Sequence, residues 1–117
     1  MIFLKKILSL SLGIITLCLF FLPSNVRADK IKVVTTTDFY GQVAEEVLGN
    51  KGKVTSIINN PSVDPHDYEP TTQTAKQVSN ANIVIYNGLG YDSWITKLSN
   101  GKKKIDVATD VMHAKDG

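Results

Sequence analysis

Short runs of β-branched and aliphatic residues alternate with stretches of helical period along most of the chain. The runs have the length and composition of buried strands, and they are IKVVTT (31–36), VTSIIN (54–59), IVIY (83–86) and IDVA (105–108). A helical stretch separates each run from the next. Strand–helix–strand repeats of this kind form right-handed crossovers between parallel strands. The sequence therefore predicts an α/β fold with an open parallel four-stranded sheet and flanking helices.

The three helical stretches differ in the apolar face that they offer to the sheet. Residues 38–49 place six apolar or aromatic residues on one face, and 91–98 have the i, i+3, i+4, i+7 spacing of a buried stripe. The stretch from Thr72 to Asn80 has a weaker stripe. The residues expected to be buried in the first and third stretches are Phe39, Tyr40, Val43, Ala44, Val47, Leu48, Tyr91, Trp94, Ile95 and Leu98.

Residues 1–28 have the order of segments that is typical of a secretory signal peptide. Lys5 and Lys6 precede a mostly apolar run from Ile7 to Leu22, and a proline and small or polar residues follow this run. Small residues at the end of the segment place the expected cleavage after Ala28. The sequence thus predicts an exported protein.

Cleavage at this point leaves residues 29–117 as a single mature lobe. Two other interpretations of the first segment are a membrane anchor and a lipoprotein. A membrane anchor needs about 20 apolar residues to cross the hydrocarbon, and the apolar run is shorter than that. A lipoprotein is cut before a cysteine that follows small residues, whereas Cys18 follows Leu17 inside the apolar run.

Removal of the leader changes the charge of the chain. The full sequence has 13 Lys and Arg and 11 Asp and Glu. Lys5, Lys6 and Arg27 lie in the leader, so the mature lobe has 10 basic and 11 acidic residues and a net charge of −1. This balance gives no support for nucleic-acid binding. The only cysteine also lies in the leader, so the mature lobe has no disulfide.

Polar residues follow the predicted strands, at the edge where parallel sheets bind ligands. The longest of these loops, NNPSVDPHDYEP (59–70), has three prolines and one histidine, His66. The acids around the histidine are Asp64, Asp67 and Glu69. Pro65 and Pro70 restrict the backbone, so the imidazole is presented from a stiff loop. This favours a metal ligand whose second nitrogen is held by a carboxylate; the alternative is a surface histidine in a turn.

His66 by itself does not make a transition-metal site, because zinc takes four ligands in structural sites and three from the protein in catalytic ones. The other histidine, His113, lies 47 residues further along the chain, and no short ligand spacing links the two. We therefore expect His113 on an exposed connection.

The sequence shows no arrangement that is typical of an enzyme. Gly88 and Gly90 lack the third glycine of a dinucleotide-binding loop and do not follow the first strand, so they indicate a tight turn. The mature lobe has no cysteine and no Gly-x-Ser-x-Gly motif.

Two segments carry a family resemblance, VVTTTDFYGQVAEEVLG (33–49) and VDPHDYEPTTQTAKQVSNANIVIYNGLGYDSWI (63–95). They resemble the N-terminal lobe of the zinc and manganese solute-binding proteins of bacterial ABC importers, the TroA-like group that includes the ZnuA-type proteins and streptococcal adhesin-type lipoproteins. The run from Asp64 to Pro70 is specific to this group.

The resemblance implies that His66 is the first of four metal ligands in a cleft between two α/β lobes. It also implies that Thr71 and Thr72 begin the next helix, and that Asn87 to Gly90 line the rim near the cleft. Proteins of this group are carriers and not enzymes. They capture zinc or manganese in the periplasm or at the cell surface and deliver the metal to the membrane permease of an ABC importer.

This chain is much shorter than the proteins of the group, so we expect a truncated form. The resemblance implies that the remaining ligands lie beyond residue 117, one of them in a Pro-His-x-Trp motif, and the second-ligand role is not transferred to His113. These ligands distinguish zinc from manganese, so the metal stays open. Two alternatives also stay open: a remnant that neither folds well nor binds metal, and a surface adhesin or interaction protein.

Overall fold

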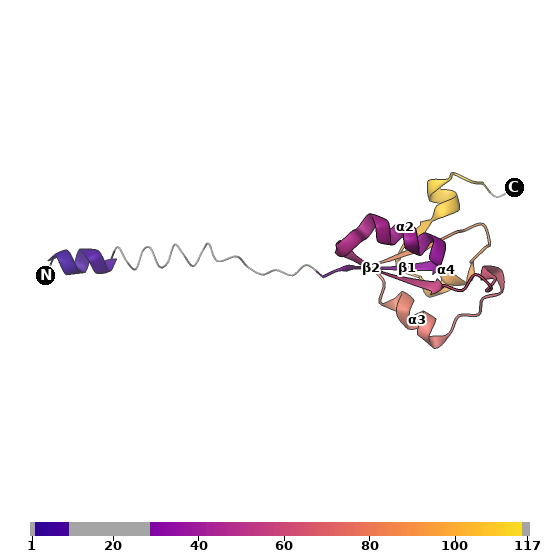
Figure 1. The fold of residues 1–117 in the computed structure, drawn as a ribbon, viewed down its shortest axis with the longest axis horizontal. Coiled ribbons are helices and arrows are strands. Elements are labelled where there is room, and N and C mark those ends of the chain that lie inside the picture. The colour runs from indigo at the N-terminus through magenta and orange to yellow at the C-terminus, as the bar shows by residue number, and fades with distance from the viewer. Residues whose placement is uncertain (1, 10–28, 116–117) are drawn as a thin grey trace.

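The computed structural model describes residues 2–9 and 29–115, and the second range forms an α/β lobe. Its strands are β1 (Ile31–Thr37), β2 (Gly52–Ile58), β3 (Ile83–Tyr86) and β4 (Lys103–Asp106). They form one sheet in the order β2-β1-β3-β4, and each neighbouring pair is parallel (Figure 1). The predicted parallel four-stranded sheet is confirmed.

Helices cover both faces of this sheet. They are α2 (Asp38–Leu48), α3 (Thr72–Ser79) and α4 (Trp94–Leu98), and α2 and α3 lie on opposite faces (Figure 1). Shorter turns occur at Gly49–Lys51, Pro65–Asp67 and, in π-helical form, Val107–Val111. The main apolar core lies on the face covered by α3 and α4, and its buried members are Val34, Val78, Ala81, Val84 and Ile95.

Two threonines fix the start of α3. The Thr71 hydroxyl oxygen accepts a hydrogen bond from the Thr74 backbone N–H at 3.2 Å, and the Thr74 hydroxyl oxygen accepts one from the Thr71 N–H at 3.2 Å. This reciprocal pair is a capping box, which satisfies two N–H groups at the helix start. The expectation that Thr71 and Thr72 begin this helix is confirmed.

Helix α2 exists as predicted, but of its predicted face only Ala44 is buried. Phe39, Val43 and Val47 are 72%, 54% and 80% exposed, whereas the buried residues of α2 are Gly41 and Ala44. A Cβ built on Gly41 would lie 2.0 Å from the Ser56 side-chain oxygen. The helix therefore approaches the sheet through its small residues, and this close approach turns the larger apolar side chains outward.

The helix predicted over residues 91–98 is shorter in the structure, where α4 begins at Trp94. The Asp92 carboxylate accepts hydrogen bonds from the backbone N–H groups of Asn87 and Gly88, which holds the segment before Trp94 in turns. Ile95 is fully buried as expected, but Tyr91 is 36% exposed. A side chain that captures backbone donors competes with helix formation in this way.

The predicted signal peptide falls largely outside the described residues. Residues 2–9 are helical and the described part of the chain resumes at residue 29. Among the described residues, no helix has both the length and the apolar content needed to cross a membrane.

Candidate metal site

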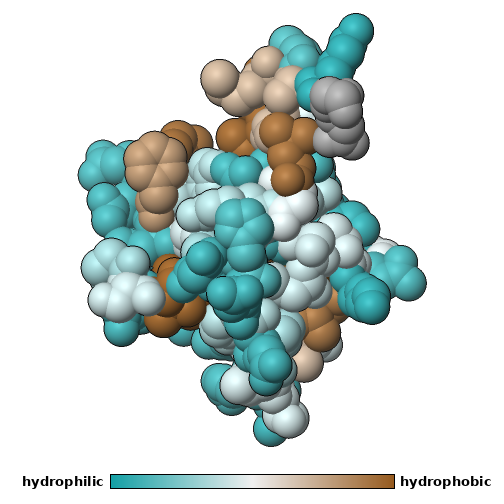
Figure 2. Space-filling view, turned by 90° about the vertical axis from the view of Figure 1, so that its right-hand side faces the viewer, coloured by the Kyte–Doolittle hydropathy of each residue, from teal (hydrophilic) through white to brown (hydrophobic). Residues whose placement is uncertain are grey.

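The histidine loop, residues 59–71, follows β2 at the edge where the strands end. Thr37 lies beside Ile58 in neighbouring strands, and Tyr86 lies beside Asp106, so the loops that follow all strands begin at this carboxyl edge. Figure 2 views the lobe from this side and shows a mostly hydrophilic face with separate apolar patches. The parallel topology thus places the loop where ligands are expected.

A short 3-10 turn, Pro65–Asp67, presents His66 from this loop. Pro65 is the first residue of the turn and is buried, and its ring fixes the backbone there. The Asp64 carboxylate caps the turn, because its Oδ1 accepts a hydrogen bond from the His66 backbone N–H at 2.9 Å. His66 therefore extends from a backbone that is fixed by a proline and a cap.

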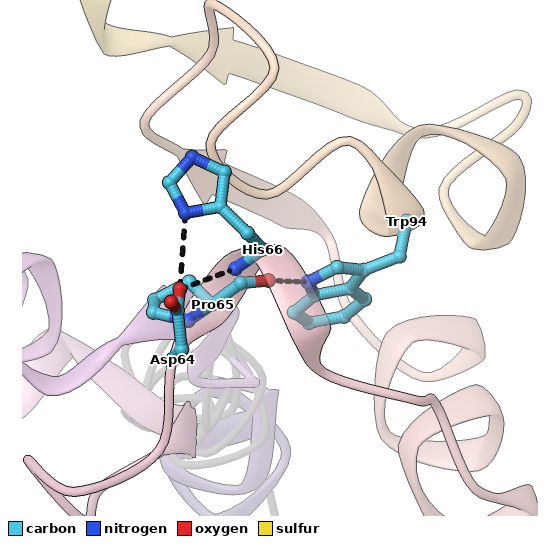
Figure 3. A network of polar contacts seen from close by, with 4 residues as sticks. All are labelled: Asp64, Pro65, His66 and Trp94. Carbon is cyan, nitrogen blue, oxygen red and sulfur yellow. Dashed lines mark hydrogen bonds and ion pairs between the residues drawn. The ribbon is translucent and has the colours of Figure 1, made fainter.

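The same carboxylate also orients the imidazole of His66. Asp64 Oδ1 lies 3.0 Å from His66 Nδ1, and both side chains are more than half exposed (Figure 3). When Nδ1–H donates to this oxygen, Nε2 keeps its lone pair for a metal. The hydrogen bonds from the His66 backbone N–H and then from its ring hold the pKa of Asp64 below its ordinary value. Asp64 is therefore a charged acceptor at neutral pH.

Two aromatic residues outside the loop hold it in place. Trp94 Nε1 donates a hydrogen bond to the Pro65 carbonyl oxygen at 3.1 Å (Figure 3). The Tyr91 ring packs edge-to-face with the His66 ring, with centroids 4.8 Å apart and planes at 80°. The sequence predicted both aromatics only as core residues of a helix. The signal that points to Trp94 is general, since an indole N–H needs an acceptor when the ring is buried.

The other acids of the loop do not contact His66. Asp67 and Glu69 are exposed, and neither side chain makes a hydrogen bond or ion pair among the described residues. Asp64 is thus the carboxylate that the fold selects, although the sequence offered three. The described residues contain no group of three or more His, Cys, Asp or Glu side chains that is suited to a metal ion.

His113 lies in the exposed segment after the π-helical turn, as expected, and it has a positive φ of 54°. It makes no hydrogen bond to the histidine loop in the part of the chain that the structure describes. Nothing in the geometry pairs it with His66.

The loop that begins at Asn87 is also at the carboxyl edge. The Tyr40 hydroxyl donates a hydrogen bond to the Asn87 side-chain oxygen. Burial, and then the charge of Asp92, raise the pKa of Tyr40 above its ordinary value, so this hydroxyl stays protonated and can donate. Gly88 and Gly90 have positive φ values of 83° and 77°, which confirms the tight turn.

The loops at the carboxyl edge of the sheet are poor in basic residues. Residues 54–75, 83–96 and 105–114, which include the loops at the carboxyl edge, contain no Lys or Arg. Lysines lie instead at the amino ends of the strands, at positions 30, 32, 51, 53 and 102–104. The carboxyl edge therefore favours the approach of cations.

A hollow of about 400 Å³ lies beside the loop, between it and the start of α2. Its lining includes Asp38, Phe39, Val63, Pro65 and Tyr91, but His66 does not line it. The His66 side chain is more than half exposed and is not part of this hollow.

Comparison with known proteins agrees with this geometry. A family model described as zinc-uptake complex component A, periplasmic (ZnuA), matches residues 33–117. The chain belongs to this family. The manganese ABC transporter substrate-binding lipoprotein PsaA of Streptococcus pneumoniae is 35% identical over 98 residues, which are 80% of this chain and 31% of that protein. The iron ABC transporter substrate-binding lipoprotein MtsA of Streptococcus pyogenes is 33% identical and is matched over 27% of its length.

Solved structures of this ZnuA family have the same fold. The periplasmic zinc-binding protein TroA of Treponema pallidum superposes with a TM-score of 0.61 at 25% identity, over 68% of this chain and 30% of that one. The Zn(II)-bound ZnuA-like domain of AdcA from Streptococcus pneumoniae gives 0.61 at 25% identity over 71% of this chain and 33% of that domain. The chain spans about a third of the length of the curated relatives that it matches.

Asp64→Asn tests the orienting contact in this ZnuA-family lobe. We expect the zinc dissociation constant to rise by about 10-fold, because a neutral amide holds the ring nitrogen less firmly than a carboxylate does. Isothermal titration with zinc measures the change. Asp67→Asn is the matched control, since it removes the same charge from the same turn, and it should change the constant by less than about twofold. An equal loss in both variants would assign the effect to the net charge of the loop.

Proposed function

We propose that residues 29–117 form the N-terminal metal-binding lobe of an exported solute-binding protein, and that residues 1–28 are its signal peptide. In this proposal the protein captures a divalent transition metal in the periplasm or at the cell surface and delivers it to the permease of an ABC importer. It is a carrier and not an enzyme. The observation that carries the proposal is the His66 ring, which Asp64 holds through Nδ1 at the carboxyl edge of a ZnuA-family lobe.

His66 Nε2 is the proposed metal ligand. The family match, the hydrogen bond that leaves Nε2 available and the absence of basic residues from the surrounding loops support this assignment. The remaining ligands of a complete site come, in this proposal, from parts of a longer protein, because the described residues contain no group of three or more donors suited to a metal ion. The chain then supplies one ligand, His66, to a site that is completed elsewhere.

Zinc or manganese is the proposed cargo. Relatives are named for manganese and for iron, and structural neighbours are named for zinc, nickel or manganese. An imidazole serves all of these metals, whereas further carboxylates favour manganese and further imidazoles favour zinc. His66 alone supports the class of divalent transition metals.

Titration of the full chain with zinc, manganese and magnesium tests the proposal. The His66 ring protons, followed by NMR, should move or broaden with zinc, which binds once per chain with a dissociation constant on the order of 10 µM or weaker. Manganese should bind more weakly than zinc, and magnesium, which prefers oxygen ligands, should leave the ring protons unchanged.

Two outcomes would contradict this expectation. His66 resonances that do not respond to zinc at millimolar concentration would remove the proposed ligand. A nanomolar dissociation constant would show that this chain supplies a nearly complete site, against the proposal that it supplies one ligand.

A further inference from the structure

Asp92 is a fully buried carboxylate at the carboxyl edge of the sheet. Its Oδ2 accepts hydrogen bonds from the Thr36 hydroxyl at 2.5 Å and from the Asn87 N–H at 2.7 Å, and its Oδ1 accepts one from the Gly88 N–H at 3.1 Å. No Lys or Arg pairs with it among the described residues. A buried carboxylate is costly unless hydrogen bonds satisfy it, and here they join the end of β1 to the turn after β3.

The residues on either side of Asp92 are those that hold the histidine loop. Tyr91 packs against the His66 ring, and Trp94 donates to the Pro65 carbonyl. The backbone between them is fixed at both ends, because the Tyr91 N–H donates to the Gly88 carbonyl at 3.1 Å and the Ile95 N–H donates to the Asp92 carbonyl at 3.2 Å. Asp92 thus anchors the short segment from which both aromatic side chains extend.

We propose that Asp92 is a positioning residue for His66. By holding the turn 87–93 against β1, it places the Tyr91 ring against the imidazole and so fixes the direction in which Nε2 points. Asp64 and Asp92 then have separate roles, because Asp64 selects the ring nitrogen that carries the proton and Asp92, through Tyr91, restricts the tilt of the ring. The role in metal binding rests on the proposed function, whereas the placement of the ring is a property of the metal-free chain.

A restrained ring matters because a ligand that is already oriented loses less conformational entropy on coordination. His66 is more than half exposed, so little besides Asp64 and Tyr91 limits its motion. Residues that contact a metal-ligating histidine without binding the metal typically contribute about 10- to 100-fold to metal affinity. We expect the indirect contact through Tyr91 to lie at the low end of this range.

Asp92→Asn is the first test. The amide keeps the shape of the side chain, but one oxygen becomes a nitrogen that donates, so at least one of the three donors loses its acceptor. We expect the His66 ring protons of the metal-free chain to lose the ring-current shift caused by Tyr91 and to move toward their positions in Tyr91→Leu. The zinc dissociation constant should rise by about 10-fold.

Ser99→Ala is the matched control for a general loss of stability. Ser99 is as fully buried as Asp92, but its hydroxyl donates within α4, to the Ile95 carbonyl at 2.7 Å, and not to the turn 87–93. Its replacement should leave the His66 resonances unchanged. The zinc affinity should stay within twofold of that of the unmodified chain. A second pair of variants tests the hydrogen bond between Thr36 and Asp92 without changing Asp92 itself. Thr36→Val, which lacks the hydroxyl, should shift the His66 resonances as Asp92→Asn does. Thr36→Ser, which keeps the hydroxyl, should give the spectrum of the unmodified chain.

Unchanged His66 resonances in Asp92→Asn, or equal changes in Ser99→Ala, would overturn the positioning role. The two proposals fail separately. If the ring protons move as expected in the metal-free variants but zinc perturbs none of the chains, Asp92 positions the ring and the proposed metal function is wrong.

Discussion

Replacement of His66 by alanine is expected to weaken zinc binding by at least about 100-fold, to the level of non-specific binding by surface carboxylates. The other donors near this position are exposed carboxylates, and no group of three or more His, Cys, Asp or Glu side chains in the described part of the chain is suited to a metal. Zinc prefers imidazole and thiolate to isolated carboxylates. Competition with a chromophoric zinc chelator measures the loss.

His113→Ala is the control for this variant. His113 is the other histidine of the chain and lies on an exposed segment, so its removal should leave the zinc affinity within about twofold. A loss in His113→Ala as large as that in His66→Ala would show that the two imidazoles bind the metal together. The expectation that His113 has no part in the site would then be wrong.

Gly88→Ala is expected to lower the free energy of unfolding by about 2–4 kcal/mol. A Cβ at this position would lie 2.0 Å from Asp106 Oδ1, and the positive φ of 83° adds a backbone term of about 1 kcal/mol. Asp106 does not move away freely, because its Oδ1 accepts a hydrogen bond from the Thr109 N–H at 3.0 Å. Urea unfolding followed by circular dichroism measures the change.

Gly90→Ala separates the steric cost of the clash with Asp106 from the backbone cost of the positive φ. Gly90 has a similar φ of 77°, but a Cβ there would meet no atom within 4 Å, so only the backbone cost of about 1 kcal/mol is expected. In an Asp106→Ala background, the cost of Gly88→Ala should fall to the Gly90 value. Equal costs for the two glycines in the original background would mean that the Asp106 side chain adapts without loss.

The strands show how far periodicity predicts this fold. All four lie within a few residues of the predicted runs, because short β-branched segments separated by helical stretches have few other arrangements. The helices were predicted less well. Of the predicted α2 face, Ala44 is buried, but Phe39, Val43 and Val47 are exposed. The helix also buries Gly41, which the apolar pattern did not include. The pattern of hydrophobic residues does not show that Gly41 allows α2 to approach the sheet closely.

The sequence by itself determined the order of the elements and the place of His66. Parallel crossovers bring the loops that follow all strands to one edge, so any residue just after β2 must lie there. The sequence also predicted a stiff loop with carboxylates near His66, because prolines and acids act on their near neighbours in the chain.

Only the folded structure decided which groups hold the imidazole, through one local contact and several contacts between distant residues. Asp64 was one of three candidate acids, and the turn that Pro65 begins brings its carboxylate to both the backbone and the ring of His66. The contacts of Tyr91 and Trp94 with the loop, and of Asp92 with Thr36, join residues that are 25 to 56 positions apart. Such contacts depend on how packed side chains meet across the sheet edge. The pattern of polar and apolar positions along the chain therefore does not predict them.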